Sequence, residues 1–165
     1  MNKAEKYQVV VKQINALPEM GRKERLQKIA QLLQESFGFW WTGFYFVETM
    51  PWIEEVRCDG KEEEPGGKGP WLILGPNVGP PACERISFGR GVCGTAWKER
   101  KTIIVPDVDE FPGHIACSSE SRSEIVVPVF IDNEVAGVLD IDSRKLAAFD
   151  EIDAEWLQQI VGGIG

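Results

Sequence analysis

The sequence lacks an excess of positive charge, a long apolar run and an apolar N-terminal segment. Its net charge is -8 and its pI about 4.8, so no basic field is available to attract a nucleic acid or an anionic membrane. No run of 18 apolar residues occurs, and the opening MNKAEKYQVV has no signal-peptide core. We therefore expect a cytoplasmic protein with no membrane and no nucleic-acid partner.

Histidine and paired cysteine motifs are also scarce. There is one histidine, His114, and the four cysteines show no C-x-x-C spacing; they are Cys58, Cys83, Cys93 and Cys117. In a reducing compartment such cysteines are buried, metal-bound or catalytic rather than structural staples. Three cysteines and His114 could in principle bind zinc, but the spacing is too wide for a zinc finger, and we predict no metal.

The chain length suits one domain, residues 1–165. A chain of 165 residues with 43% hydrophobic side chains buries enough surface to fold without disulfides. Residues 58–70 are charged and rich in glycine and proline, and we expect a mobile loop at about 49–70. No internal repeat is found.

Apolar spacing predicts two amphipathic helices in the first third of the chain, separated at Pro18 and Gly21. The aromatic segment 39–48 is predicted to be a strand with both faces covered, with Trp41 and Tyr45 on the same face. Further predicted elements are strands at 71–74 and 102–106, a short helix at 92–100, a hairpin of 124–131 and 134–142, and a last helix capped by Asp150. This order predicts an α+β domain, a mainly antiparallel sheet with helices on its faces.

The string G-R-G-V-C-G at residues 89–94 fits the dinucleotide fingerprint G-x-G-x-x-G. However, PPACERIS before it holds no central parallel strand, and the helix after it is too short for a crossover. The glycines are better explained by a tight turn into a helix. That turn would place Cys93 in the first helical turn, where a thiolate is stabilised.

Two carboxylates end the second hairpin strand. Asp140 and Asp142 fall on one face, about 6–7 Å apart. They either reach solvent, as is common near strand ends, or form an acidic pocket suited to an ammonium group and to proton donation.

Glu124 can join these acids only in one hairpin register. A two-residue Asp132-Asn133 loop pairs Glu124 with Ile141 and sends it to the opposite face. A three-residue loop or an equivalent bulge pairs it with Asp142. We predict the second arrangement.

The strings WTGFY, LGP, FGRGVCGTA, GHIAC, SRSEIVVPV and GVLDIDS stand together in this order. From about residue 39 to the end the chain resembles a GAF domain and, more narrowly, the free methionine-(R)-sulfoxide reductase family. The N-K-x-x-F-x-x-x-D motif of cyclic-nucleotide-binding GAF domains is missing. The resemblance implies a central antiparallel sheet with helices on its faces.

The resemblance also implies roles for particular residues. Cys117 matches the nucleophile, Cys83 the resolving cysteine, and Cys93 a third cysteine that can replace Cys83. Glu124, Asp140 and Asp142 match the pocket acids, with Glu124 or Asp142 as proton donor. Asp140, Trp41 and Tyr45 are expected to bind substrate. No cofactor is expected: an external dithiol, thioredoxin in this family, resets the enzyme, and homodimers are common.

One departure from the family is LGPNVG, where Asn77 and Val78 replace an aromatic residue and an amide in a stretch expected to border the pocket. Two other functions stay open at this point. One is a GAF module that binds a small molecule without chemistry. The other is a redox switch that forms a Cys83–Cys117 disulfide in response to peroxide.

Overall fold

The computed structural model describes residues 1–58, 69–113 and 120–164. Its elements, in chain order, are α1 (Lys3–Asn15), α2 (Arg22–Phe37), β1 (Trp41–Val47), α3 (Ile53–Val56), β2 (Trp71–Val78), β3 (Arg85–Ser87), α4 (Gly91–Glu99), β4 (Ile103–Val105), the 3-10 turn η1 (Val108–Glu110), β5 (Ser123–Ile131), β6 (Glu134–Ser143) and α5 (Glu151–Gly162). Within the described ranges, none of the helices combines the length and apolar character that crossing a membrane requires.

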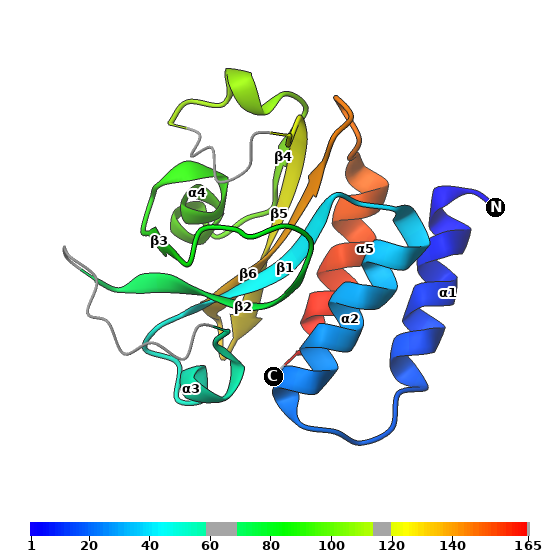
Figure 1. The fold of residues 1–165 in the computed structure, drawn as a ribbon, viewed down its shortest axis with the longest axis horizontal. Coiled ribbons are helices and arrows are strands. Elements are labelled where there is room, and N and C mark those ends of the chain that lie inside the picture. Colours follow the sequence, from blue (N-terminus) through cyan, green and yellow to red (C-terminus); the bar gives the residue numbers. More distant parts are fainter. Residues whose placement is uncertain (59–68, 114–119, 165) are drawn as a thin grey trace.

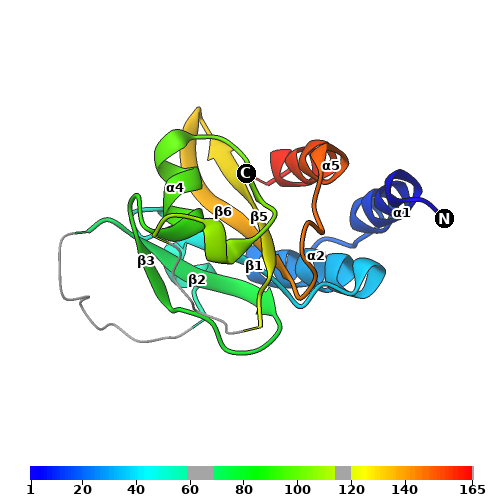
Figure 2. The ribbon, with the colours of Figure 1, turned by 90° about the horizontal axis from the view of Figure 1, so that it is seen from above.

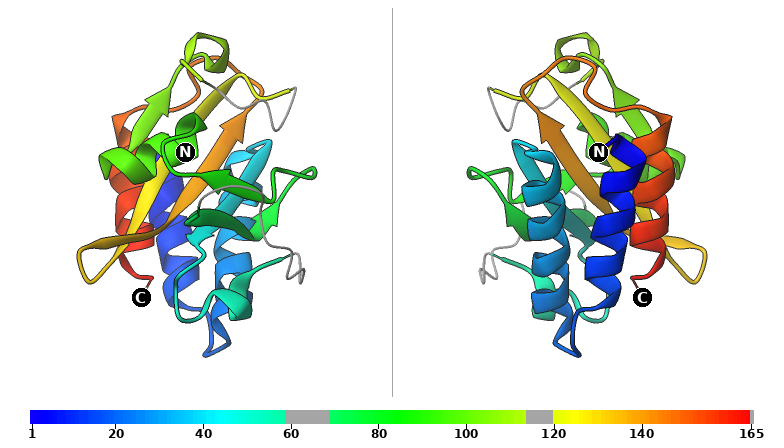
Figure 3. Two further views of the ribbon diagram at one scale, coloured as in Figure 1. Left: turned by 90° about the vertical axis from the view of Figure 1, so that its left-hand side faces the viewer. Right: turned by 90° about the vertical axis from the view of Figure 1, so that its right-hand side faces the viewer.

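Six strands form one sheet in the order β3-β2-β1-β6-β5-β4, and every neighbouring pair is antiparallel. Helices α2 and α5 pack on one face of this sheet, and α1 lies outside them as an outer layer (Figures 1 and 2). Helix α4 lies on the opposite face, against β5 and β6. The two views of Figure 3 show these two sides of the sheet in turn. The predicted α+β class with an antiparallel sheet is confirmed.

Strand β1 is central and covered on both faces, as its aromatic sequence predicts. All seven of its residues are buried. Phe44 and Phe46 belong to the core under α1, α2 and α5, whereas Trp41 and Tyr45 belong to a second core under α4. Successive side chains of β1 therefore point alternately to the face of the sheet covered by α2 and α5 and to the face covered by α4.

The helical layer is held at its outer end by a polar network. The Tyr7 hydroxyl donates to Asp153 Oδ1 at 2.6 Å, and Lys3 Nζ lies 2.7 Å from Asp153 Oδ2. Asp150 caps α5, as predicted, by accepting from the backbone N–H groups of Ile152 and Asp153 in a capping box. α1 is thereby fixed against the start of α5.

Three local features differ from the sequence prediction. The predicted loop at 49–70 contains α3, whose Ile53 and Val56 are buried in the core, while residues 59–68 lie outside the described part of the chain. Strand β2 continues through GPNV to Val78. The short edge strand β3 was missed because three residues of mixed polarity carry no periodic signal.

The glycine run at 89–94 is a turn into α4 and not a dinucleotide loop. The strand before it is the antiparallel β3, and α4 has nine residues. Gly89 and Gly91 have positive φ angles of 77° and 63°. A Cβ on Gly94 would lie 2.6 Å from the Ser87 carbonyl oxygen, so the close approach also requires glycine.

Candidate active site

The β5–β6 hairpin brings the three predicted acids to one face. Asp132 and Asn133 form a two-residue turn with φ angles of 52° and 65°, closed by the pair Ile131 and Glu134.

This turn alone would pair Glu124 with Ile141. The register shifts next to the turn, because Phe130 pairs with Val135 but Val129 pairs with Gly137, and Ala136 has no opposite residue. The bulge places Glu124 opposite Asp142, so the predicted register is confirmed in its bulge form.

The acids lie in a cavity between β1, the hairpin and the start of α4. The cavity is lined by Trp41, Tyr45, Pro81, Ala82, Ile86, Arg90, Gly91, Val92, Cys93, Ser121, Glu124, Asp140 and Asp142. β1 pairs Trp41 with Asp142 and Gly43 with Asp140, which sets an aromatic wall beside the carboxylates. The sheet therefore brings all the predicted acids and both predicted aromatic residues to one small cavity.

The carboxylates are crowded and poorly solvated. Glu124 and Asp140 are 6% and 7% exposed. Burial first, and then the neighbouring Asp140 and Asp142, raises the pKa of Glu124 well above its ordinary 4.5. Burial first, and then Asp140, raises the pKa of Asp142 as well. The cavity thus favours at least one protonated carboxyl at neutral pH.

Ser121 is a site residue that the sequence analysis missed. Its hydroxyl donates to Asp142 Oδ1 at 2.8 Å, and this hydrogen bond opposes the rise in the pKa of Asp142. Nothing in the local pattern of SRSE distinguishes this serine from a surface serine. Its position three residues before Glu124 is the one available clue.

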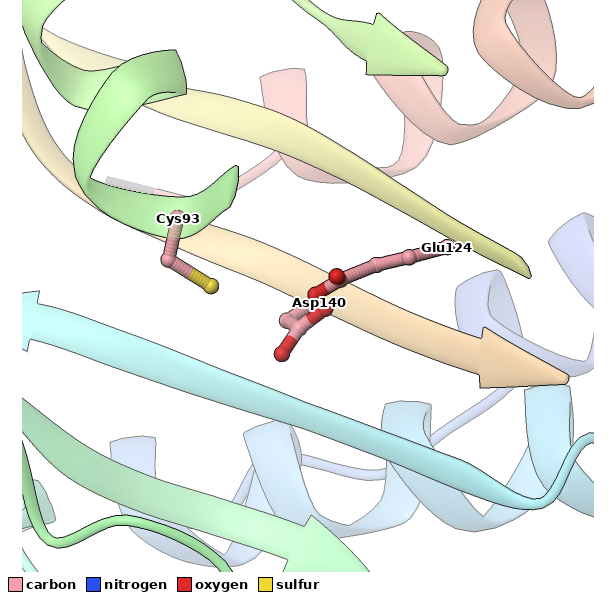
Figure 4. Close-up of side chains that lie close together, drawn as sticks. All are labelled: Cys93, Glu124 and Asp140. Carbon is pink, nitrogen blue, oxygen red and sulfur yellow. The ribbon is translucent and has the colours of Figure 1, made fainter. Parts of the chain in front are cut away.

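Cys93 is placed as predicted but is not the stabilised thiolate that was expected. It lies in the first turn of α4 and is 4% exposed, and its side chain points toward Asp140 and Glu124 (Figure 4). Burial first, and then the acids, raises the pKa of the Cys93 thiol well above 9.0. The helix terminus favours a thiolate, but desolvation and three nearby acids outweigh it.

The same three side chains are the one candidate metal-ligand group within the described residues. Cys93 Sγ and carboxylate oxygens of Glu124 and Asp140 all lie within 4.8 Å of one another. A thiolate and two carboxylates would suit a thiophilic divalent cation. These ligands line the cavity itself, so a cation there would compete with any small molecule for the acids.

Two aromatic side chains of β1 hold the backbone that carries Cys83. Trp41 Nε1 donates to the Pro80 carbonyl at 3.0 Å, and the Tyr45 hydroxyl donates to the Cys83 carbonyl at 2.8 Å. Burial first, and then Cys93 and the acids, raises the pKa of Tyr45, so its hydroxyl stays protonated and donates. Cys83 itself is disulfide-bonded, whereas Cys58 and Cys93 carry reduced thiols.

The sequence matches a known protein family over most of its length. The family model described as "GAF domain" matches residues 20–165. This chain belongs to the GAF family. The sheet, its helices on both faces and the cavity under α4 are therefore those of a GAF domain.

Several relatives of this GAF domain are named for one activity. The free methionine-R-sulfoxide reductase of Escherichia coli is 38% identical over 164 residues, which is 98% of this chain and 87% of that protein. The X-ray structure of the Neisseria meningitidis free methionine-R-sulfoxide reductase in complex with its substrate is 45% identical with a TM-score of 0.83, covering 98% of this chain and 87% of that one.

A third relative, GAF domain-containing protein A of Dictyostelium discoideum, is 47% identical over 162 residues, 97% of this chain and 90% of that protein. The resemblance stated from the sequence is confirmed.

One predicted site residue falls outside the part of the GAF domain that the structure describes. This is Cys117, predicted to be the nucleophile. Its role stays a prediction from the sequence.

Asn77 and Val78 do not line the cavity, contrary to expectation. Both lie in β2, paired with Gly43 and Thr42 of β1. The Asn77 amide donates to the Gly75 carbonyl at 2.9 Å, while Val78 packs against the helix-side core. The departure from the family string is therefore a strand substitution rather than a change in the cavity wall.

Proposed function

We propose that this GAF domain reduces free methionine-(R)-sulfoxide to methionine. The observation that carries the proposal is the register of the β5–β6 hairpin, which gathers Glu124, Asp140 and Asp142 beside an aromatic wall. The relatives named free methionine-R-sulfoxide reductase, similar over nearly the whole chain, support the same activity.

The acids suit a free amino acid as substrate. An ionised carboxylate of the cavity binds the substrate ammonium, a charge that an internal methionine of a peptide lacks. The start of α4 at Gly91 and Val92 also lines the cavity, and its backbone N–H groups would bind the substrate carboxylate. The rings of Trp41 and Tyr45 would pack against the methyl group and side chain. This division of contacts explains a preference for the small, zwitterionic substrate.

The chemistry requires a thiolate, a proton donor and a second thiol. The thiolate of Cys117 attacks the sulfoxide sulfur, and Glu124 or Asp142 donates a proton to the sulfoxide oxygen. The new S–S bond then breaks as this hydroxyl passes from the substrate sulfur to the Cys117 sulfur. The products are methionine and a sulfenic acid on Cys117. The raised pKa of Glu124 and of Asp142 keeps such a proton available at neutral pH.

A second thiol then restores the enzyme. The Cys83 thiolate attacks the sulfenic sulfur, a Cys83–Cys117 disulfide forms, and the oxygen leaves as water with one added proton. A dithiol such as thioredoxin reduces this disulfide and becomes oxidised itself. Cys83 directly follows Pro81 and Ala82, which line the cavity, and this supports its role as resolving cysteine. The buried, protonated thiol of Cys93 suits an alternative of slower reactivity. The whole cycle belongs in a reducing cytoplasm and needs no further cofactor.

Turnover of separated epimers tests this function. The domain is mixed with free methionine-R-sulfoxide or the S epimer and a thioredoxin system, and each epimer is followed by chromatography. We expect consumption of the R epimer alone. Cys117→Ser should abolish it, whereas Cys58→Ser should not, because Cys58 is absent from the cavity lining and its thiol donates to the Gly75 carbonyl.

Two outcomes would replace the proposal. Binding of either epimer without turnover would indicate a ligand-sensing GAF module. A disulfide that forms with peroxide while methionine sulfoxide has no effect would indicate a redox switch.

A further inference from the structure

The segment 79–84, which carries Cys83, is tied to β1 and β2 at three backbone positions. Trp41 donates to the Pro80 carbonyl, and Tyr45 donates to the Cys83 carbonyl. At the end of the segment, the Leu74 N–H donates to the Glu84 carbonyl at 3.0 Å. Two of these three hydrogen bonds come from side chains that also line the cavity.

Trp41 is itself fixed by two glycines. Its indole lies across Gly43, where a Cβ would overlap the ring, and across Gly79, where a Cβ would lie 2.6 Å from Trp41 Cδ1. Gly79 has a φ of +136°, which side chains rarely adopt. The ring of Trp41 also lies 6.0 Å from the ring of Tyr45, centroid to centroid. The donors of both aromatic residues are thus held in place before any ligand arrives.

We propose that Tyr45, with Trp41, is a positioning residue for the resolving step: its hydroxyl holds the Cys83 backbone where the Cys83 thiol can reach the sulfenic acid. This inference rests on the proposed function, and it assigns to the Tyr45 hydroxyl a task separate from substrate contact. The protonated state of that hydroxyl fits the task, because a phenolate could not donate to a carbonyl.

The physical reason is effective concentration. Disulfide formation between two cysteines of one chain is fast and favourable when the thiols are held close together. Both its rate and its equilibrium constant fall when one of the cysteines lies on a loosely held segment. Removing the Tyr45 hydroxyl leaves the Cys83 carbonyl without this donor and loosens the anchored end nearest the thiol. The attack of Cys117 on the sulfoxide does not involve Cys83, and phenylalanine keeps the ring of Tyr45 that packs against the substrate, so the larger effect should fall on the resolving step.

The test compares Tyr45→Phe with wild type in two assays. In a single turnover without reductant, disulfide formation should slow about tenfold more than methionine formation does, so sulfenic acid, trapped by dimedone, accumulates. In a buffer of reduced and oxidised dithiothreitol, the constant for forming the Cys83 disulfide should fall about tenfold, which equals about 1.4 kcal/mol.

Tyr7→Phe is the matched control. It also removes a buried tyrosine hydroxyl that donates a hydrogen bond, to Asp153 at 2.6 Å, but at the helical layer away from the cavity. It should lower thermal stability while leaving both assays at wild-type values.

Equal disulfide constants for Tyr45→Phe and wild type would overturn the inference. So would an equal loss of methionine formation and disulfide formation, since Tyr45 would then act on the substrate step. If wild type forms no methionine, the proposed function fails, yet the dithiothreitol equilibrium still decides the role of Tyr45.

Discussion

Replacing Glu124 with glutamine should make the folded domain more stable at neutral pH while making it a poorer enzyme. Glu124 is 6% exposed and faces Asp140 and Asp142. Burial and these neighbours disfavour its ionised form, so the folded chain keeps a proton that the unfolded chain releases. Glutamine has nearly the same shape and no charge to bury.

The size of the effect follows from proton linkage. The pKa of Glu124 is raised in the folded state above the ordinary 4.5, so below about pH 4.5 both states hold the proton and stability does not change. Above that pH, up to the folded pKa, the folded state holds one proton more. Its stability therefore falls by up to about 1.4 kcal/mol per pH unit. The Glu124→Gln variant lacks this slope, so its advantage over wild type should grow with pH through this window.

Urea denaturation at pH 5, 6, 7 and 8 measures this difference. For a domain of this size, each 1 kcal/mol corresponds to about 2–4 °C in thermal midpoint, so melting curves provide a second readout. Glu134→Gln is the control, because Glu134 is exposed at the turn and its replacement should leave the pH slope unchanged. In the same samples kcat/KM for methionine-R-sulfoxide should fall at least tenfold, through loss of a charged or proton-donating group. Parallel stability curves for wild type and Glu124→Gln would refute the reasoning, since Glu124 would then be solvated.

Three further variants test the fold and the site. Asp150→Ala removes the capping box of α5 and should cost about 0.5–2 kcal/mol of unfolding free energy, measured by urea denaturation. Gly137→Ala places a Cβ where the Tyr45 carbonyl oxygen lies and should cost about 1–3 kcal/mol or more, whereas Gly162→Ala, with nothing within 4 Å, should not destabilise. Ser121→Ala removes the hydrogen bond that lowers the pKa of Asp142, so the falling limb of the kcat/KM profile should move to higher pH.

Features set by local sequence were predictable. The alternation of β1 predicted its two covered faces, and Asp150 before an acidic first turn predicted the start of α5. Each depends on residues within one turn or one strand. The positive φ angles of Asp132 and Asn133 also follow from local preference.

Features set by tertiary contact were not predictable in the same way. The first-turn position of Cys93 suggested a thiolate, but the state of the thiol depends on acids that come from β5 and β6. Helix α3 was missed because four residues are too few to show a helical period, although Ile53 and Val56 are buried. Ser121 has a role only because the β5–β6 register brings Asp142 to it.

The bulge at Ala136 connects these two kinds of feature. Without the bulge, the two-residue turn would pair Glu124 with Ile141, and the Glu124 side chain would then point into the helix-side core that holds Leu139 and Ile141. A carboxylate buried there without a partner would cost several kcal/mol, whereas a bulge leaves one residue unpaired at the end of a hairpin. The acids therefore favour the bulged register on energetic grounds. The one local sign of a bulge is Gly137, next to Ala136, and a glycine within a strand can equally mark a close backbone approach. This is why the register could be predicted from the placement of Glu124 while the position of the bulge could not.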